Sequence, residues 1–327
     1  MKNYLLNRLR INIKSIGKIE DNIQDKIIFN NSNIKKKEIL KDKHFQNILS
    51  NQYKPNKIAV VICFHFKEKR LKTLEYNILN INKYNFQKDL TIITNDITKK
   101  NQEKIHKIIR DKIKNYSIIT VKNLPDDNFL PWYSINVMRE KIKSKSFSHF
   151  MFLEDDIIVN SENISYWIYF RKILKKFNLV PNFLRCETYG GKYYSVDNPK
   201  RISKTKMPTI LTKTKNYGFI NSKYPYSGMY LMDRDLLKIF LKSSASKIDF
   251  GFTHKIMRSL YPIKELANIS YAYFSVPNGY HNKLVLPFEG NKIPPYCIIQ
   301  HKDLKYSKFK SLNTIGHGTI NINELIK

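Results

Sequence analysis

Three neighbouring acidic residues, Glu154, Asp155 and Asp156, directly follow an apolar run at residues 149–153. Such a run predicts a strand that is buried on both faces. Carboxylates placed this close repel one another unless a cation lies among them. Because Mg²⁺ and Mn²⁺ bind carboxylate oxygens together with phosphate oxygens, this acid cluster predicts a Mn²⁺ or Mg²⁺ site for a diphosphate. The alternative is a solvated acidic turn or a set of helix-capping carboxylates.

The acid cluster ends the fourth of a series of strand-like apolar runs, which cover residues 58–64, 90–94, 117–121 and 149–153. Apolar residues with helical spacing lie between the runs, at residues 71–81, 105–113 and 132–143. Alternating strands and helices predict βαβ units and an α/β fold with a mostly parallel central sheet.

Polar residues follow three of the apolar runs, at the edge of the sheet where ligands bind in such folds. The carboxyl ends of parallel strands meet at one edge of the sheet, and ligands bind beyond that edge. Phe64-His65, Asn95-Asp96 and the acid cluster all fall there. We therefore expect these residues to surround one site.

The second half of the chain has a less regular pattern. It predicts helices at residues 167–177, 235–241 and 252–260, and strands at 183–187, 226–232 and 296–299. Five prolines interrupt the remainder, and no linker-like segment separates it from the first half.

The segment FMFLEDDIIV, residues 150–159, resembles the metal-binding segment of GT-A-fold glycosyltransferases. In that family an Asp-x-Asp or Glu-Asp-Asp motif ends a strand and holds the metal and the nucleotide sugar. The resemblance implies a GT-A-like fold in which Asp156 is the principal metal ligand. It places Glu154 and Asp155 near the ribose, the sugar or metal-bound water. Phe64, His65, Asn95 and Asp96 would then approach the base and ribose of the donor.

Residues 181–187, 276–277 and 300–306 resemble segments of a poorly characterised group of these transferases, so the similarity covers about residues 57–306. That group carries an acidic residue in the helix after the segment Asp249-Phe250-Gly251, where this chain has Thr253-His254. The catalytic base is therefore expected at His254, whose imidazole suits proton removal at neutral pH, or at Asp249. A helix-capping Asp and an exposed His are the alternative interpretation.

A histidine completes the metal shell in many GT-A enzymes, and neutral imidazole is a suitable ligand for Mn²⁺. His301, after the expected strand at 296–299, is the preferred candidate. His317 lies between two glycines and is the competing one. An ordinary surface histidine is the third interpretation.

Three further residues are candidates for binding. Arg139, on the helix before the acid cluster, is assigned to the donor, with a solvated helix face as the alternative. Arg185 and Glu187 alternate along a strand and so share a face. We assign both to the acceptor site, where they would pair with each other.

The implied organisation is a Lys/Asn-rich extension at residues 1–55 and one catalytic domain. Its nucleotide-sugar-binding half spans residues 56–160, and its irregular acceptor-binding half spans residues 161–327. The expected function is metal-assisted transfer of a sugar from a nucleotide-sugar donor to a glycan or lipid-linked acceptor. A metal-dependent nucleotidyltransferase or phosphoesterase is one alternative. A basic, non-enzymatic protein that binds nucleic acid or membrane is another.

The formal net charge is +31, which suits a polyanionic partner. However, only ten of the 58 basic residues are Arg, the residue best suited to phosphate and base contacts, and the Lys residues are spread along the chain. We therefore expect no specific nucleic acid, while peripheral contact with anionic lipid remains compatible.

Three scattered cysteines argue against a disulfide framework and a structural zinc site. The chain has no apolar run of about 20 residues and no signal-peptide pattern at its start. We expect a cytoplasmic protein. Any contact with the membrane would be peripheral and on its inner face. The absence of a Gly-rich phosphate loop counts against a kinase, an NTPase and a Rossmann dehydrogenase.

Overall fold

A computed structural model describes residues 53–124, 127–175, 179–198, 201–202, 209–211, 217–221, 228–242, 246, 284–289, 291–302, 306–307 and 318–326. Residues 1–52 of the expected extension lie outside this part of the chain. So do the candidate bases Asp249 and His254, the expected helix at 252–260 and the competing ligand His317.

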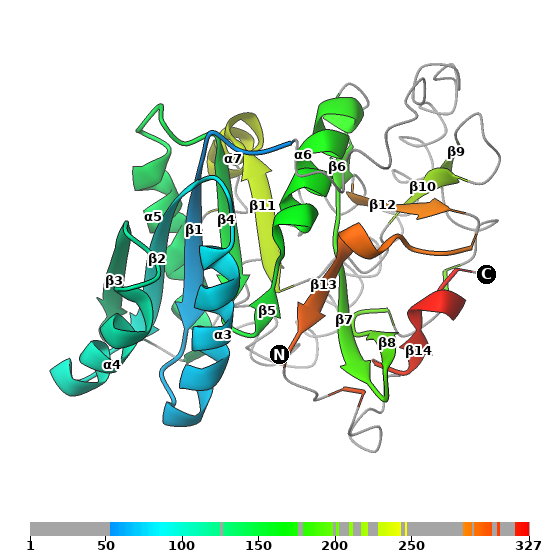
Figure 1. Ribbon diagram of the computed structural model, residues 1–327. Coiled ribbons are helices and arrows are strands. Elements are labelled where there is room, and N and C mark those ends of the chain that lie inside the picture. Colours follow the sequence, from blue (N-terminus) through cyan, green and yellow to red (C-terminus); the bar gives the residue numbers. More distant parts are fainter. Residues whose placement is uncertain are drawn as a thin grey trace, which may run out of the picture.

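The central sheet has the strand order β11-β4-β1-β2-β3 (Figure 1). Strands β1 to β4 run parallel, and β11 pairs antiparallel with β4. β1 is buried from Ile58 to Phe64, which explains its continuous apolar sequence. The four predicted strands of the first half are thus confirmed. The five strands are β1 (Lys57–Phe64), β2 (Gln87–Asn95), β3 (Tyr116–Val121), β4 (His149–Glu154) and β11 (Met229–Asp233).

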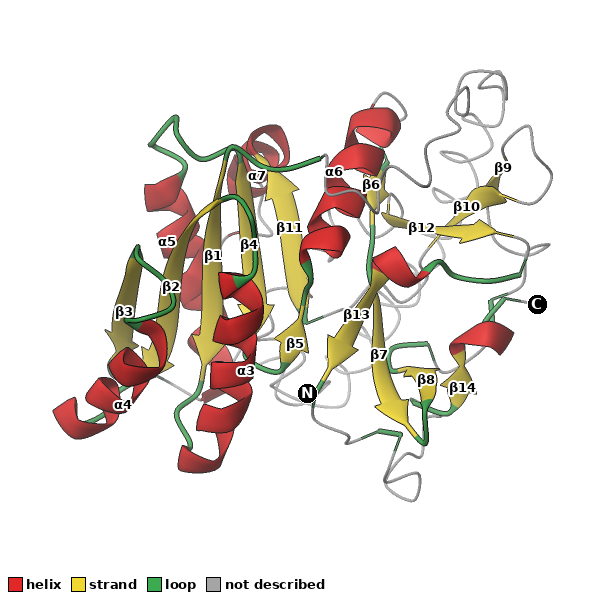
Figure 2. Ribbon diagram, viewed as in Figure 1, coloured by secondary structure: helices red, strands yellow, loops and turns green. Residues whose placement is uncertain are grey.

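Helices cover both faces of this sheet (Figures 1 and 2). α3 (Leu71–Asn82) and α4 (Lys99–Ile109) lie on one face, and α5 (Ser134–Lys141) and α7 (Arg234–Lys242) lie on the other. The expected helix at 132–143 is correct only in part. It begins as the 3-10 helix η2 (Asp127–Tyr133), which contains Pro131, and the α-helix starts after it because proline has no N–H to donate in a helix interior.

A second sheet, with the order β14-β8-β7-β13-β5, lies beside the first. The expected strand at 296–299 is misplaced, because the prolines at 294–295 start the 3-10 helix η7 (Pro295–Cys297) and β13 follows it. The strands of this sheet are β5 (Ile157–Ile158), β7 (Leu184–Tyr189), β8 (Lys192–Ser195), β13 (Ile298–His301) and β14 (Ile320–Asn321).

A smaller third sheet has the order β6-β12-β10-β9. Helix α6 (Ser161–Leu174) packs against it and against η7 through large buried side chains, among them Tyr166 and Phe170. The sheet consists of β6 (Val180–Pro181), β9 (Thr209–Leu211), β10 (Tyr217–Asn221) and β12 (Leu284–Glu289).

The strand order reverses between β1 and β4. The chain proceeds from β1 to β2 and β3 on one side, and then returns to place β4 on the other side of β1. Ligands of open α/β sheets bind beyond the carboxyl ends of the strands at such a reversal. The acid cluster at the end of β4 is therefore where the topology predicts a site.

The chain is thus an α/β protein with a mostly parallel central sheet flanked by helices and two further sheets. Among the described residues, no helix combines the length and the apolar character that crossing a membrane requires.

Candidate functional site

Helix α3 fixes the backbone that follows the acid cluster. The side-chain amide of Asn77, which is fully buried, donates a hydrogen bond to the carbonyl oxygen of Ile157 at 2.9 Å. Asn80, one turn further along the helix, and Tyr84, just beyond its end, donate to the carbonyl oxygen of Val159 at 2.6 and 2.5 Å. Three polar side chains from α3 and the residues after it therefore hold this segment in place.

The opposite side of the acid cluster is closed by the start of β11. The backbone N–H of Glu154 donates to the carbonyl oxygen of Gly228 at 2.9 Å. Gly228 has a φ of +66°, and a Cβ atom there would lie 2.9 Å from Cγ1 of Ile157 and 3.0 Å from Oε2 of Glu154. Both the backbone conformation and the close approach require glycine at this position.

The cation that the three carboxylates need is supplied in part by the protein itself. Arg70, at the start of α3, donates from Nε to Oδ2 of Asp155 at 2.8 Å and from Nη2 to Oδ1 of Asp155 at 2.5 Å. The same Nη2 also lies 3.0 Å from Oδ2 of Asp156. The two-point contact with Asp155 is the geometry in which guanidinium binds a carboxylate most strongly.

Arg70 was not among the residues that the sequence predicted for this site, since it closes the charged stretch Lys67-Glu68-Lys69. A usable signal was present. Arg70 is the one arginine that follows β1 within the segment leading to its helix, at the edge of the sheet where ligands bind.

Burial and mutual repulsion dominate the electrostatics of the acid cluster. Burial raises the pKa of Asp155, the adjacent Asp156 raises it further, and Arg70 opposes both. Burial lowers the pKa of Arg70, but the carboxylates of Asp155 and Asp156 outweigh this and raise it. Burial also raises the pKa of the Cys63 thiol at the end of β1, which disfavours a thiolate nucleophile there.

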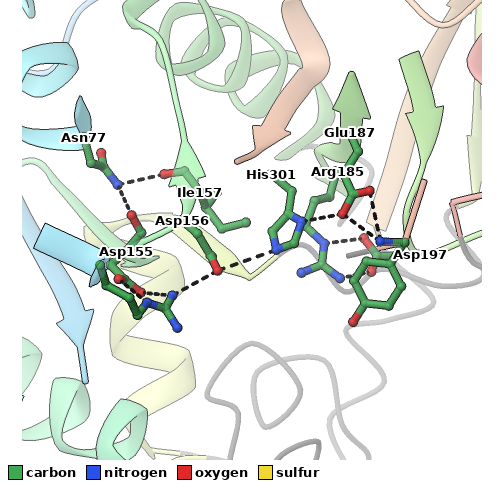
Figure 3. Close-up of polar contacts among 10 residues, drawn as sticks. Asn77, Asp155, Asp156, Ile157, Arg185, Glu187, Asp197 and His301 are labelled. Carbon is green, nitrogen blue, oxygen red and sulfur yellow. Dashed lines mark hydrogen bonds and ion pairs between the residues drawn. The ribbon is translucent and has the colours of Figure 1, made fainter. Parts of the chain in front are cut away.

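Strand pairing brings His301 to the acid cluster. In the antiparallel pair of β13 and β5, His301 lies opposite Ile157, and the N–H of Lys302 donates to the carbonyl oxygen of Asp156 at 2.9 Å. Nε2 of His301 lies 3.6 Å from Oδ2 of Asp156 (Figure 3). The predicted proximity of His301 and Asp156 is therefore present in the structure.

Glu187 lies on the far side of the same imidazole ring. Its Oε1 is 2.8 Å from Nδ1 of His301, and its Oε2 accepts hydrogen bonds from the backbone N–H and the hydroxyl of Ser307, both at 2.6 Å. The backbone N–H of Tyr306 donates to the same carboxylate at 3.1 Å. Although burial raises the pKa of Glu187, these hydrogen bonds outweigh that effect and lower it, so this fully buried carboxylate is ionised.

The expected pair of Arg185 and Glu187 is not formed. Instead Arg185 binds Asp197 through two hydrogen bonds of 2.5 and 3.1 Å, and both side chains are buried. The turn after β8 brings Asp197 to Arg185, since the N–H of Val196 donates to the carbonyl oxygen of Arg185 at 3.0 Å. Figure 3 shows Arg185 directed to Asp197 and Glu187 directed to His301. Both residues thus make internal contacts beside the acid cluster.

Residues after β1 and β2 are placed at the same edge of the sheet, but their roles differ. Phe64 is fully buried and packs edge-to-face on Phe66, so its side chain belongs to the core. Asn95 accepts a hydrogen bond from the N–H of Phe66 at 2.7 Å and thereby holds the segment after β1. Nε2 of His65 lies 2.8 Å from the carboxylate of Asp127.

Within the part of the chain that the structure describes, the two remaining donor candidates form no hydrogen bond or ion pair with the acid cluster. Asp96 is exposed after the end of β2. Arg139 lies near the end of α5, from which the chain enters the amino end of β4, and it donates to the carbonyl oxygen of Ser246 at 3.0 Å. Arg139 therefore lies toward the opposite edge of the sheet from Asp155.

Within the described residues, no group of three or more His, Cys, Asp or Glu side chains is arranged to hold a metal ion. Two expected ligands do meet there, Asp156 and His301. Asp155 is bound on both carboxylate oxygens by Arg70 and is less suited to be a third ligand.

Protein-family models give no match to this chain, and no curated protein matches it either.

Proposed function

We propose that this chain is a nucleotide-sugar-dependent glycosyltransferase of the GT-A type, with a glycan or lipid-linked acceptor. The observation that carries the proposal is the meeting of Asp156 and His301 at 3.6 Å, beside the point where the strand order reverses. Such a reversal is where an α/β sheet binds its ligand. The strand order β4-β1-β2-β3 is also found in α/β folds that bind nucleotides.

Asp156 and His301 fit a divalent cation that takes its remaining ligands from substrate. Two neighbouring ligands of an octahedral ion, each bonded at about 2.1 Å, lie about 3 Å apart. The observed 3.6 Å between Oδ2 and Nε2 is close to that separation. Mg²⁺ and Mn²⁺ sites of substrate phosphates commonly use one or two protein ligands, so a three-residue set is not required. Bound there, the ion would neutralise the diphosphate and stabilise it as a leaving group.

The other residues of the candidate site surround Asp156 and His301 and would position them or the donor. Arg70 offsets the charge of Asp155, and its contact with Asp156 orients that carboxylate as well. Asn77 and Gly228 fix the backbone on either side of the acid cluster. His65 and Asn95 lie at the ends of β1 and β2, where the base and ribose of a nucleotide would bind.

Calorimetric titration with UDP-, GDP- and CMP-sugars, each with and without Mn²⁺, tests the proposal. We expect one class of nucleotide sugar to bind in a Mn²⁺-dependent manner, and Asp156→Asn to abolish the Mn²⁺ dependence. Glu103→Gln, an exposed carboxylate of α4 that pairs with Arg110, is the matched control and should bind normally. Release of nucleoside diphosphate on addition of glycan or lipid acceptors then distinguishes transfer from binding. Binding that is equal in Asp156→Asn and wild type would refute the proposal.

A further inference from the structure

We propose that Glu187 is a positioning residue that holds His301 in the tautomer protonated at Nδ1, so that the lone pair of Nε2 faces Asp156. This inference rests on the proposed function for its purpose, which is to present Nε2 to a divalent cation. The tautomer itself follows from contacts within the chain.

The first step concerns the acceptor capacity of Glu187. A carboxylate only accepts hydrogen bonds, and its neighbour Nδ1 of His301 lies 2.8 Å from Oε1. Nδ1 must therefore be the donor. In a neutral imidazole one nitrogen carries the proton and the other carries the lone pair, so Nε2 is left as the acceptor.

The second step concerns the rigidity of Glu187. Its Oε2 accepts from the N–H of Tyr306 and from both the N–H and the hydroxyl of Ser307, at 3.1, 2.6 and 2.6 Å. Glu187 is 0% exposed and His301 is 3% exposed, so water does not compete for these bonds. The carboxylate therefore cannot rotate away from His301 without leaving several buried donors unsatisfied.

The third step is that strand pairing fixes the line from Glu187 through His301 to Asp156. β13 pairs with β7, which carries Glu187, on one side and with β5, next to Asp156, on the other. The imidazole thus stands between the two carboxylates (Figure 3). A carboxylate on one ring nitrogen and a ligand position at the other is the arrangement that orients histidines toward metal ions.

The substitution Glu187→Gln makes the inference testable, because it exchanges one acceptor for a donor. The three donors from Tyr306 and Ser307 should hold the amide oxygen at the position of Oε2. The amide nitrogen would then occupy the position of Oε1 and donate to Nδ1 of His301. Since Nδ1 would have to accept, the ring proton is expected to move to Nε2, which would point it at Asp156.

The measurement is ¹⁵N nuclear magnetic resonance of histidine-labelled protein without metal, at alkaline pH where the ring is neutral, with His301→Gln identifying the signal. We expect a protonated Nδ1 in the wild type and a protonated Nε2 in Glu187→Gln. In parallel, Mn²⁺ affinity measured by electron paramagnetic resonance should fall by about 10–100-fold in Glu187→Gln.

Ser307→Ala is the matched control. It removes one hydrogen bond to Oε2 but leaves Oε1 a carboxylate oxygen, so any loss of stability should leave the tautomer and the Mn²⁺ affinity near those of the wild type. A wild-type ring protonated at Nε2 would overturn the inference even if Glu187→Gln does not fold. An unchanged tautomer in folded Glu187→Gln would overturn it as well. If the tautomer reverses but no nucleotide sugar binds the wild type, the proposed function fails and the positioning role of Glu187 stands.

Discussion

Arg70 and Asp155 face each other in parallel, with Nε and Nη2 of the guanidinium 2.8 and 2.5 Å from the two carboxylate oxygens. This contact joins the start of α3 to the end of β4, across 85 residues of sequence. It changes the interpretation of the acid cluster, because one of its carboxylates is balanced by the protein without any metal. In the function that we propose, Asp156 and His301 are then the pair left to bind a divalent cation.

Removal of the Arg70 guanidinium should leave the neighbouring carboxylates of Asp155 and Asp156 without their counter-charge, so that they repel each other. We expect Arg70→Met to lower the free energy of unfolding by about 2 kcal/mol, less than the 3–5 kcal/mol of a fully buried pair because Arg70 is 29% exposed. Urea unfolding at pH 7 measures it. Arg70→Lys should recover only part of the loss, since an ammonium cannot make the two-point contact. Equal stability of Arg70→Met and wild type would show that the contact has no net value.

The packing of β11 on the acid cluster can be tested at Gly228. Gly228→Ala meets both an unfavourable φ of +66° and side-chain atoms within 3.0 Å of the new Cβ. Gly190 is the matched control, because its φ is +56° but nothing lies within 4 Å of an added Cβ. We expect Gly190→Ala to cost about 1 kcal/mol of stability for the backbone conformation alone, and Gly228→Ala to cost about 1–3 kcal/mol more for the overlap. Metal-dependent nucleotide binding should weaken only in Gly228→Ala. Similar losses in the two variants would show that the close approach is not important.

The buried pair of Arg185 and Asp197 makes a different prediction from the acceptor-binding role first expected of Arg185. Arg185→Met alone should destabilise the fold by about 3–5 kcal/mol, because it leaves a buried carboxylate uncompensated. The double variant Arg185→Met/Asp197→Leu should recover much of that loss. A double-mutant cycle in urea measures the coupling. Additive effects, together with a weaker affinity for acceptor at unchanged stability, would return Arg185 to the acceptor site.

Much of the fold could be predicted because buried parallel strands carry continuous apolar sequences. β1 and β4 are examples, and residues of the candidate site directly follow both strands. Local signals failed near prolines. Around Pro131 a 3-10 helix replaces the first part of an expected α-helix, and at Pro295 a 3-10 helix replaces the start of an expected strand. The partners of charged residues were the least predictable feature. Glu187 and His301 are 114 residues apart and meet only because β7 and β13 pair, which no local pattern encodes.

The same limit applies to the acid cluster. Its position after β4 was readable from the sequence. The location of Arg70 after β1 was readable too, but its pairing with Asp155 was not, because that contact joins residues 85 positions apart. The side chain of Asn77 gave no signal either, since a polar residue on a helix is ordinarily exposed. The sequence therefore located the acid cluster, while long-range packing decided which side chains surround it.

His149, at the start of β4, makes the stability of the protein depend on pH. Its Nδ1 lies 2.9 Å from the hydroxyl of Ser148, and its ring meets Trp167 edge-on at 6.1 Å. Burial lowers the pKa of His149 to about 4, although Asp233, opposite it on β11, acts to raise it. In the unfolded chain the pKa of histidine is about 6.5. Between these values the unfolded state binds more protons, so stability must fall as the pH is lowered from about 6.5 to about 4.

Urea unfolding of the wild type and of His149→Asn at pH 7.5 and at pH 5 isolates this contribution from that of the carboxylates, which both proteins share. Asparagine is chosen because its side-chain amide can replace Nδ1 toward Ser148 while it does not titrate. The wild type should lose roughly 2 kcal/mol more than the variant on acidification to pH 5, at about 1.4 kcal/mol for each pH unit below 6.5. If instead the two proteins lose the same stability, His149 is protonated equally in the folded and unfolded chains, and its burial does not exclude the charged form.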